Sequence, residues 1–318
     1  RGGVSTPRCL GLDTSNYTTS AAVFGAGCGR NAGKLLEVPA GSLGLRQSEA
    51  LFQHVKRLPQ LVKILEEEGL LHNLAAVGAS TRPRAVEGSY MPCFLPGEST
   101  GRCLASALGV PFFPCSHQQG HLAAAAWSAG QPELLGKPFL AWHLSGGTTE
   151  LLRVEPAGCA PRAEILGGTS DISAGQLIDR TGVLLGLPFP AGKALDALYH
   201  RADAAVEYRV KLNGLTFSLS GMENQVKKLL EEGEKPANIA RFTLDTVISV
   251  VLRATQEARR RYPGLPVLCS GGVASNSQLR AVLERSCGAF FAQPRYAADN
   301  AMGTAILTWR ALERGERP

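Results

Sequence analysis

Apolar runs that end in short polar turns recur along the chain. Residues 9–15 read as a buried strand that runs into a polar turn, and residues 20–24 resume as a second strand. About 130 residues later the same order returns, because residues 139–144 enter the turn 145–149 and residues 150–154 leave it. Two such units predict an α/β protein with a duplicated architecture.

Stretches of helical periodicity separate these strands. Residues 48–69 place apolar side chains on one stripe, and Pro59 inside that stripe predicts either a kinked helix or two consecutive helices. Residues 75–79 have the composition of a further strand, and residues 98–108 that of another helix. Residues 239–261 form a long pattern with an apolar stripe. Strands and helices therefore alternate along most of the chain.

Three turns rich in small residues could carry chemistry: residues 13–15, 145–149 and 270–276. Glycine lets a backbone approach a ligand closely, and free N–H groups can then point at a phosphate. The third turn leads into a predicted helix at residues 277–285, whose N-terminus would favour an anion. Each turn alone also fits an ordinary connection between strands. If the three converge on one cleft, they predict a nucleotide clamp.

Two histidines follow Pro114 at the start of a predicted helix, with the spacing of one helical turn. His117 and His121 would lie one above the other, so one cation could bind both imidazoles. Two histidines that fall close together by chance on a packing helix are the alternative. Gln118 stands where a zinc protease has glutamate, so the pattern is not that of a metalloprotease. A third ligand must come from elsewhere, and Asp299 is the best candidate.

Composition and charge narrow the class of protein. The chain has 318 residues, 44% hydrophobic and 19% charged, which is typical of a globular protein with two domains of ordinary size. No apolar run reaches the roughly 18–20 residues that cross a bilayer, so no membrane association is expected. The net charge of +6 is compatible with nucleic acid or nucleotides as partners. Three consecutive arginines at 259–261 fit that interpretation, but they equally fit a solvated helix end.

Cysteine spacing bears on the compartment and on metal sites. The eight cysteines form no CxxC pair, so neither a zinc ribbon nor a thioredoxin-like site is expected. Several lie in apolar segments, as small buried thiols do. A reducing, cytoplasmic location is therefore predicted.

Together these motifs resemble the TsaD family, the threonylcarbamoyl transferases that modify tRNA. The resemblance runs from about residue 9 to residue 311. Its most specific elements are the HxxxH of His117 and His121, the SGG turn at 145–147, the GGVASN segment at 271–276, and Asp299 with Asn300. Residues 171–180, followed by Gly-Leu-Pro at 186–188, also have the family's order and spacing.

The resemblance implies a fold, a domain order and ligands. The fold is that of actin, heat-shock chaperones and sugar kinases (ASKHA), with a central nucleotide cleft. We expect an N-terminal lobe at residues 8–135 with the metal helix, a C-terminal lobe at 136–298, and a metal-ligand turn with a closing helix at 299–318. In the family a zinc or iron ion is bound by residues that match His117, His121 and Asp299. Its contacts to an ATP- or AMP-type nucleotide or acyl-adenylate fall on Ser145, Gly146, Gly147, Asp179, Gly192, Asp196 and Asn276. No residue is assigned as catalytic.

The sequence also departs from the family's pattern. An acidic residue after the first strand is replaced by Asn16-Tyr17-Thr18, and a glycine-rich loop by Thr81-Arg82-Pro83-Arg84. The usual SGGHT and SGLK motifs lose their histidine and lysine, since this chain has Thr148 and Glu223 at those places. The chain thus resembles a divergent paralogue that keeps the metal and nucleotide residues.

Three functions remain open. The first is threonylcarbamoyl transfer from an AMP anhydride to a tRNA adenosine, with TsaB-like and TsaE-like partner proteins. The second is carbamoyl or acyl transfer to a different acceptor, which the departures favour. The third is a non-catalytic, nucleotide-binding regulatory subunit.

Overall fold

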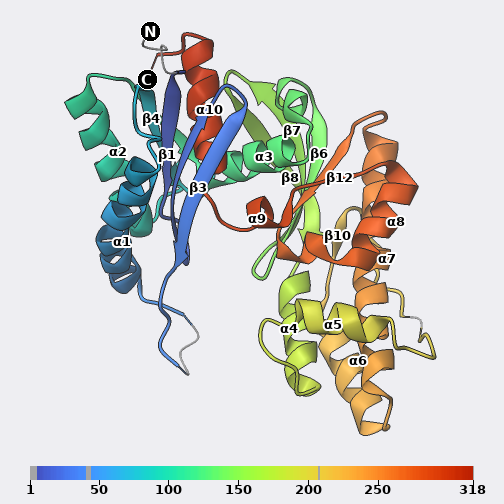
Figure 1. Ribbon diagram of the computed structural model, residues 1–318. Helices are drawn as coiled ribbons and strands as arrows, with labels where there is room; N and C mark the ends of the chain where they lie inside the picture. Colours follow the sequence, from blue (N-terminus) through green and yellow to red (C-terminus); the bar gives the residue numbers. More distant parts are fainter. Residues whose placement is uncertain (1–5, 41–43, 207, 318) are drawn as a thin grey trace. The chain divides into compact units, whose positions relative to one another are not determined.

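The computed structural model describes residues 6–40, 44–206 and 208–317 (Figure 1). The chain divides into two compact units. Unit 1 comprises Arg1–Gly136, Glu155–Arg162 and Asp299–Pro318, and unit 2 comprises Lys137–Val154 and Ala163–Ala298.

Unit 1 is built on a five-stranded sheet of order β3-β2-β1-β4-β5. Strands β1 and β2 are antiparallel, as are β2 and β3, whereas β4 and β5 continue the sheet in parallel with β1. The strands are β1 (Arg8–Asp13), β2 (Thr18–Gly25), β3 (Cys28–Leu35), β4 (Leu74–Arg82) and β5 (Phe112–Ser116). The helices are α1 (Gln47–Glu67), α2 (Leu95–Leu108), α3 (His117–Ser128) and α10 (Met302–Glu313), with short 3-10 turns at Pro92–Phe94 and Pro132–Gly136.

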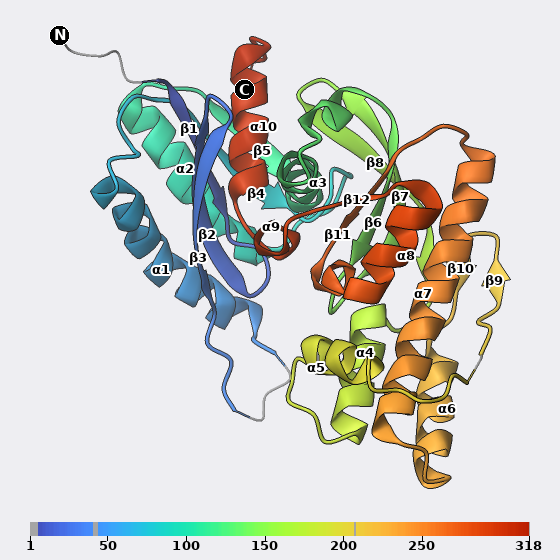
Figure 2. The ribbon, with the colours of Figure 1, turned by 45° about the vertical axis from the view of Figure 1, so that its right-hand side comes forward.

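Alternation along β1 and β4 places different helices on the two faces of this sheet. Leu10 and Leu12 point into a core that α1 and α2 complete. Gly11, between them, faces α10, and a Cβ at that position would stand 2.4 Å from the backbone nitrogen of Ala305. Gly78 on β4 also faces α10, where its Cβ would meet the side chain of Thr308. Both views show α1 and α2 on one side of the sheet and α10 on the other (Figures 1 and 2). Glycine thus lets α10 lie directly on the sheet.

Unit 2 is built on a seven-stranded sheet of order β12-β11-β6-β7-β8-β10-β9. Its strands are β6 (Phe139–Leu144), β7 (Thr149–Ala157), β8 (Ala160–Thr169), β9 (Leu212–Asn213), β10 (Thr216–Phe217), β11 (Val267–Ser270) and β12 (Phe290–Phe291). The helices are α4 (Ala174–Leu184), α5 (Gly192–Tyr199), α6 (Ser220–Glu231), α7 (Pro236–Arg261), α8 (Ser277–Cys287) and α9 (Pro294–Ala297), with a 3-10 turn at Gly272–Ser275. Trp142 of β6 is buried against α7, and its indole N–H donates to Thr255 Oγ1 at 2.9 Å.

The two sheets repeat one topology. In unit 1 the order β3-β2-β1-β4-β5 places an antiparallel β1–β2 hairpin beside two strands parallel to β1. In unit 2 the order β8-β7-β6-β11-β12 does the same around β6, which is antiparallel to β7 and parallel to β11. The predicted duplicated α/β architecture is confirmed.

Several local predictions can be compared with the elements. The helix predicted at 48–69 is one helix, α1, with Pro59 inside it, so the interpretation as two helices is wrong. The strand at 75–79 and the helices at 98–108 and 239–261 correspond to β4, α2 and α7. All eight cysteines, each in the described part of the chain, are free thiols. Within the described residues, no helix combines the length and apolarity needed to cross a membrane.

Candidate functional site

The first turn of α3 fixes the two histidines. Ser116 is the N-cap, and its hydroxyl accepts the N–H of Gln119 at 3.1 Å while the Gln119 side chain accepts the N–H of Ser116 at 2.9 Å. This reciprocal capping box holds the start of the helix in a single register. His117 is then the first helical residue, and His121 lies one turn further on.

A close contact between α3 and α10 brings Asp299 to the histidines. A Cβ on Gly303 would lie 1.6 Å from the carbonyl oxygen of Gly120, so only glycine permits this approach. The turn before α10 is fixed as well, because Asn31 Oδ1 accepts the N–H of Ala301 at 2.9 Å. Asp299 therefore lies on a held turn beside α3.

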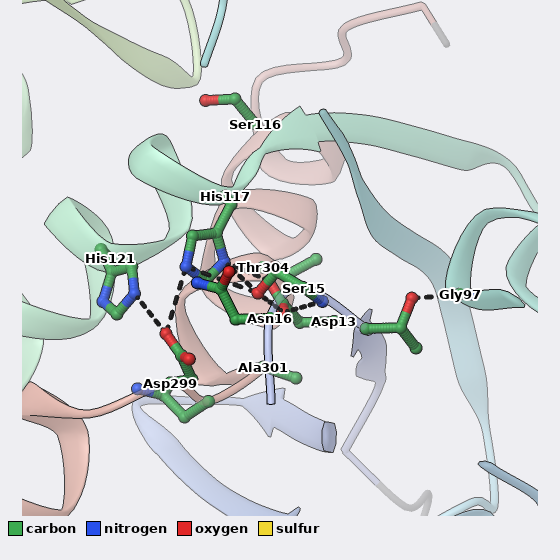
Figure 3. A network of polar contacts seen from close by, with 12 residues as sticks. Asp13, Ser15, Asn16, Gly97, Ser116, His117, His121, Asp299, Ala301 and Thr304 are labelled. Atoms are coloured by element: carbon green, nitrogen blue, oxygen red, sulfur yellow. Dashed lines mark hydrogen bonds and ion pairs between the residues drawn. The ribbon is translucent and has the colours of Figure 1, made fainter. Parts of the chain in front are cut away.

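The three predicted ligands meet in unit 1 (Figure 3). One carboxylate oxygen, Asp299 Oδ1, lies 3.2 Å from His117 Nε2 and 3.0 Å from His121 Nε2. The two imidazole rings stand edge to face, with centroids 4.3 Å apart. One ligand atom from each of the three residues falls within 4.8 Å of the others. The sequence prediction that Asp299 joins the histidine pair thus agrees with their placement.

Asp13 and Ser15 contact the Nδ1 side of His117. From the sequence, both are predicted to belong to a turn that binds nucleotide. Asp13 Oδ2 lies 2.8 Å from His117 Nδ1, and the Ser15 hydroxyl lies 2.8 Å from the same nitrogen (Figure 3). Asp13 Oδ1 accepts both the N–H of Ser15 at 3.0 Å and its hydroxyl at 2.5 Å. Both side chains are almost fully buried. The turn after β1 therefore orients His117 so that its Nε2 faces Asp299.

In this cluster, histidine and aspartate each stabilise the charged form of the other. Burial lowers the pKa of His117, but the charge of Asp13 and hydrogen bonds to Asp13 and Asp299 outweigh it and raise the pKa to about 10. Burial raises the pKa of Asp299, yet hydrogen bonds from His117 and His121 hold that pKa well below its usual range. Asp299 is thus ionised at neutral pH, as a carboxylate ligand must be, whereas His117 must release a proton when its Nε2 binds a metal.

Unit 2 contains every residue predicted to contact the nucleotide. The turn at 145–147 joins β6 to β7, and Ser145 Oγ accepts the N–H of Thr148 at 3.1 Å. Gly146 and Gly147 have open space where a Cβ would stand. The start of α4 packs on this turn, since Ser173 Oγ donates to the carbonyl of Gly146 at 2.9 Å.

Two more glycines hold neighbouring segments against the same turn. A Cβ on Gly175 would stand 2.4 Å from the Ser145 carbonyl oxygen. Gly271 has φ +96°, and its Cβ would stand 2.1 Å from the Leu144 carbonyl oxygen. The 145–147 turn, the start of α4 and the loop after β11 therefore form one connected group.

Besides Ser145, three polar residues predicted to contact the nucleotide also make local hydrogen bonds. Asp179 Oδ1 accepts the N–H of Ala191 at 2.9 Å, directly before Gly192 at the start of α5. Asp196 accepts the N–H and hydroxyl of Ser277 at 3.1 and 2.8 Å. Asn276 caps α8, where Oδ1 accepts the N–H groups of residues 278 and 279. These bonds connect α4, α5 and α8 into one group.

The departures from the family pattern in unit 1 lie next to residues that adjoin the candidate ligand His117. Asn16 follows Ser15 directly, and its carbonyl lies 3.2 Å from Nε2 of the buried His54. The carbonyl of Pro83, in the altered loop, accepts the N–H of Gln118 at 3.0 Å. In unit 2, Glu223 forms an ion pair with Arg180 at 3.0 Å.

Comparisons with known proteins identify the family of the chain. Residues 44–306 match the family described as TsaD, tRNA N6-adenosine threonylcarbamoyltransferase. The tRNA N6-adenosine threonylcarbamoyltransferase of one Thermus thermophilus strain is 33% identical over 325 residues, which cover 97% of this chain and 94% of that protein. Its counterpart from a second strain of the same species is also 33% identical, over 93% of its own length.

Solved structures of more distant proteins share the fold. HypF from T. kodakarensis has a TM-score of 0.63 at 15% identity, over 97% of this chain and 48% of that one. Component A of the (R)-2-hydroxyglutaryl-CoA dehydratase of Acidaminococcus fermentans has a TM-score of 0.55 at 16% identity, over 98% of this chain and all of that one. The predicted ASKHA fold is confirmed by these neighbours and by the repeated sheet topology. The chain therefore belongs to the TsaD family of tRNA-modifying transferases.

Proposed function

We propose that this chain transfers a threonylcarbamoyl group from its AMP anhydride to an adenosine of tRNA, with one bound zinc or iron ion. The observation that carries the proposal is the convergence of His117, His121 and Asp299 in a member of the TsaD family.

The donor set fits such an ion. Two ligands about 2.1 Å from one metal stand about 3.4 Å apart at the tetrahedral angle. The carboxylate-to-imidazole distances of 3.2 and 3.0 Å are close to that value. Two imidazoles and one carboxylate suit both zinc and iron, and three protein ligands leave room for substrate.

The chain's own residues account for much of the chemistry. Asp13 and Ser15 engage His117 Nδ1, so Nε2 is the nitrogen presented as a ligand. A bound zinc or iron ion would supply Lewis acidity toward the carbamoyl oxygen. Because a mixed anhydride with AMP is already activated, orientation and charge stabilisation are the main tasks left to the protein.

Unit 2 supplies the proposed site for ATP, AMP or the acyl-adenylate. Open space beside Gly146 and Gly147 lets a phosphate approach the backbone. Asp179 and Asp196 would accept hydrogen bonds from the ribose or acyl group, Asn276 would accept or donate one, and Ser145 and Gly192 complete the proposed contacts. Calorimetry with AMP and ATP tests this assignment. Gly147→Val should abolish binding, since its branched side chain fills open space, and unchanged affinity would exclude the turn.

A second candidate is carbamoyl or acyl transfer from an adenylate to another acceptor. It is favoured by the position of the changed segments, because Asn16 and Pro83 both adjoin residues of the metal cluster or its helix. The metal and nucleotide residues would then be kept while the acceptor changes. A non-catalytic nucleotide-binding subunit shares these features but predicts no turnover with any acceptor.

Partners and compartment follow from the same proposal. TsaB-like and TsaE-like proteins are the proposed protein partners. The eight free cysteines suit a reducing compartment, and we propose a cytoplasmic location.

Two experiments test the function. Elemental analysis of the purified protein should find about one zinc or iron per chain, and His117→Ala should lose it; equal metal in both samples would refute the site. A reconstituted assay would contain tRNA, threonine, bicarbonate, ATP and a source of the adenylate, with and without the partner proteins. We expect weak or absent tRNA modification by the chain alone. Consumption of adenylate without modified tRNA would support the second candidate.

A further inference from the structure

A basic hollow in unit 2 is separate from every residue assigned above. It has a volume of about 840 Å3 and is lined by residues of the segment 209–214, which includes β9, and of the C-terminal half of α7. Five cationic side chains and one carboxylate take part in its lining: Arg209, Lys211, Arg253, Arg260, Arg261 and Glu257.

The single carboxylate in this basic hollow is already used. Glu257 accepts hydrogen bonds from Arg260 at 2.7 Å and from Arg261 at 3.0 Å, both along α7. Those bonds lower the pKa of Glu257 to about 2, so it is ionised at neutral pH. The presence of Arg260 and Arg261 is therefore explained by the solvated end of α7, without a ligand.

The other cations do not fit that explanation. Arg209 and Lys211 come from the segment that enters β9, far from α7 in sequence, and both are exposed. In the part of the chain that the structure describes, neither has an ion-pair or hydrogen-bond partner. Among the residues that the structure describes, no carboxylate pairs with either side chain.

Arg253 also lines the basic hollow, and its guanidinium is fixed in place. One nitrogen donates to the carbonyl of Val210 at 2.8 Å, which fixes the side chain against the segment before β9. Its Nε is buried and has no hydrogen-bond partner among the described residues. Burial lowers the pKa of Arg253, and the neighbouring Arg209 lowers it further. Positive charge is thus concentrated here at a cost in repulsion, which a bound anion would offset.

We propose that this basic hollow binds consecutive phosphates of the RNA backbone. The inference rests on the proposed function only in that tRNA is the acceptor. Cations from two elements, spread around 840 Å3, suit a strand of phosphates better than one small anion. Its lining, as far as the described residues show, contains no aromatic ring on which a base could stack. Contacts are therefore to the backbone, and binding is independent of sequence.

Fluorescence anisotropy with labelled tRNA, measured at several salt concentrations, tests the proposal without any transfer chemistry. The variant carries Arg209→Glu and Lys211→Glu, two exposed positions with no partner to lose among the described residues. A matched control carries Lys34→Glu and Lys137→Glu, which change the net charge equally at exposed sites elsewhere. Circular dichroism and thermal melts verify folding, and a second variant with glutamine at 209 and 211 removes charge without reversing it.

We expect the glutamate variant to bind tRNA at least about tenfold more weakly, and the salt dependence of log K to lose about two units of slope. The glutamine variant should lose the same slope. The control variant should bind tRNA as the wild type does, and the wild type should bind a shuffled RNA as well as it binds tRNA. Equal affinity and slope in the variant and control would overturn the proposal, as would a wild type that binds no RNA at low salt. His117→Ala should bind tRNA normally, so a failure of the transfer function is distinguishable from a failure of this site.

Discussion

Replacing Asp13 by Asn tests whether the turn after β1 orients His117 for the proposed metal site. The substitution keeps the shape of the side chain but removes its charge from a position 2.8 Å from His117 Nδ1. An Asn side chain can accept at only one oxygen, whereas Asp13 uses one oxygen for His117 and the other for Ser15. One of these contacts must be lost, and the orientation of His117 weakens.

The size of the effect follows from that geometry. Loss of an outer hydrogen-bond partner of a metal-binding histidine lowers metal affinity about 10- to 100-fold, or about 1.4–2.7 kcal/mol. Competition with a chromophoric chelator for Zn2+ measures this directly on metal-free protein. His117→Ala should lose binding altogether, and Asp203→Asn, at an exposed carboxylate, should leave it unchanged.

Unchanged affinity in a folded Asp13→Asn variant would refute the positioning role. It would show that α3 alone orients His117 and that the contacts of Asp13 serve the fold. A thermal melt of the metal-free variant separates the two cases, because a purely structural role lowers stability without changing the affinity of the folded protein for zinc.

Three further predictions concern unit 2. Gly271→Ala should destabilise the protein by about 2 kcal/mol or more in urea unfolding, because a Cβ there is strained and meets backbone 2.1 Å away, whereas Gly272→Ala, with open space, should be nearly neutral. Thr255→Val should cost about 1–3 kcal/mol, since it leaves the buried indole N–H of Trp142 without its acceptor. Desolvation of Asp171 is outweighed by hydrogen bonds at the start of α6, which lower its pKa to about 2. Asp171→Asn should therefore lose up to about 1 kcal/mol at pH 7, and its deficit against the wild type should shrink as the pH falls from about 4 towards 2; a deficit that is constant with pH would contradict this.

Local patterns were sufficient to predict most elements and the duplication. Strand runs that end in small polar turns repeat because the fold repeats, and α7 is visible as a long apolar stripe. The interpretation of Pro59 as a break between two helices failed because tertiary packing overrides the loss of one helical hydrogen bond. Leu58 and Leu61 on either side of it are both buried against the sheet.

The predicted metal ligands could be chosen from the sequence by residue spacing and by the family resemblance. His117 and His121 are one helical turn apart, so helical geometry alone brings them together. Asp299 is 178 residues from His121, so no helical spacing joins the two, and the family resemblance is the main support for pairing them. The close packing that joins them depends on Gly120 and Gly303, and nothing in a single sequence pairs two distant glycines.

The role of Asp13 illustrates what periodicity cannot reveal. A strand followed by Asp-Thr-Ser fits a phosphate turn as well as a ligand-orienting turn, and the residues are the same in both. Which one forms depends on where α3 begins, 104 residues later in the chain. The basic hollow could not be predicted from the sequence either, because the arginines of α7 line a hollow only when Arg209 and Lys211 lie beside them in the fold.

The distribution of the departures from the family pattern also bears on which part of the proposed function differs in this chain. The 145–147 turn, proposed to bind nucleotide, keeps both glycines, and Gly175 and Gly271 still permit the close packing around it. The changed segments of unit 1 instead adjoin the cluster, where Asn16 follows Ser15 and Pro83 binds the first turn of α3. Substitutions there can alter what approaches the ligands without disturbing His121 or Asp299. Under the proposed function, a change of acceptor is therefore structurally simpler for this chain than a change of donor, and acceptor screens that hold the adenylate constant are the direct test of the second candidate.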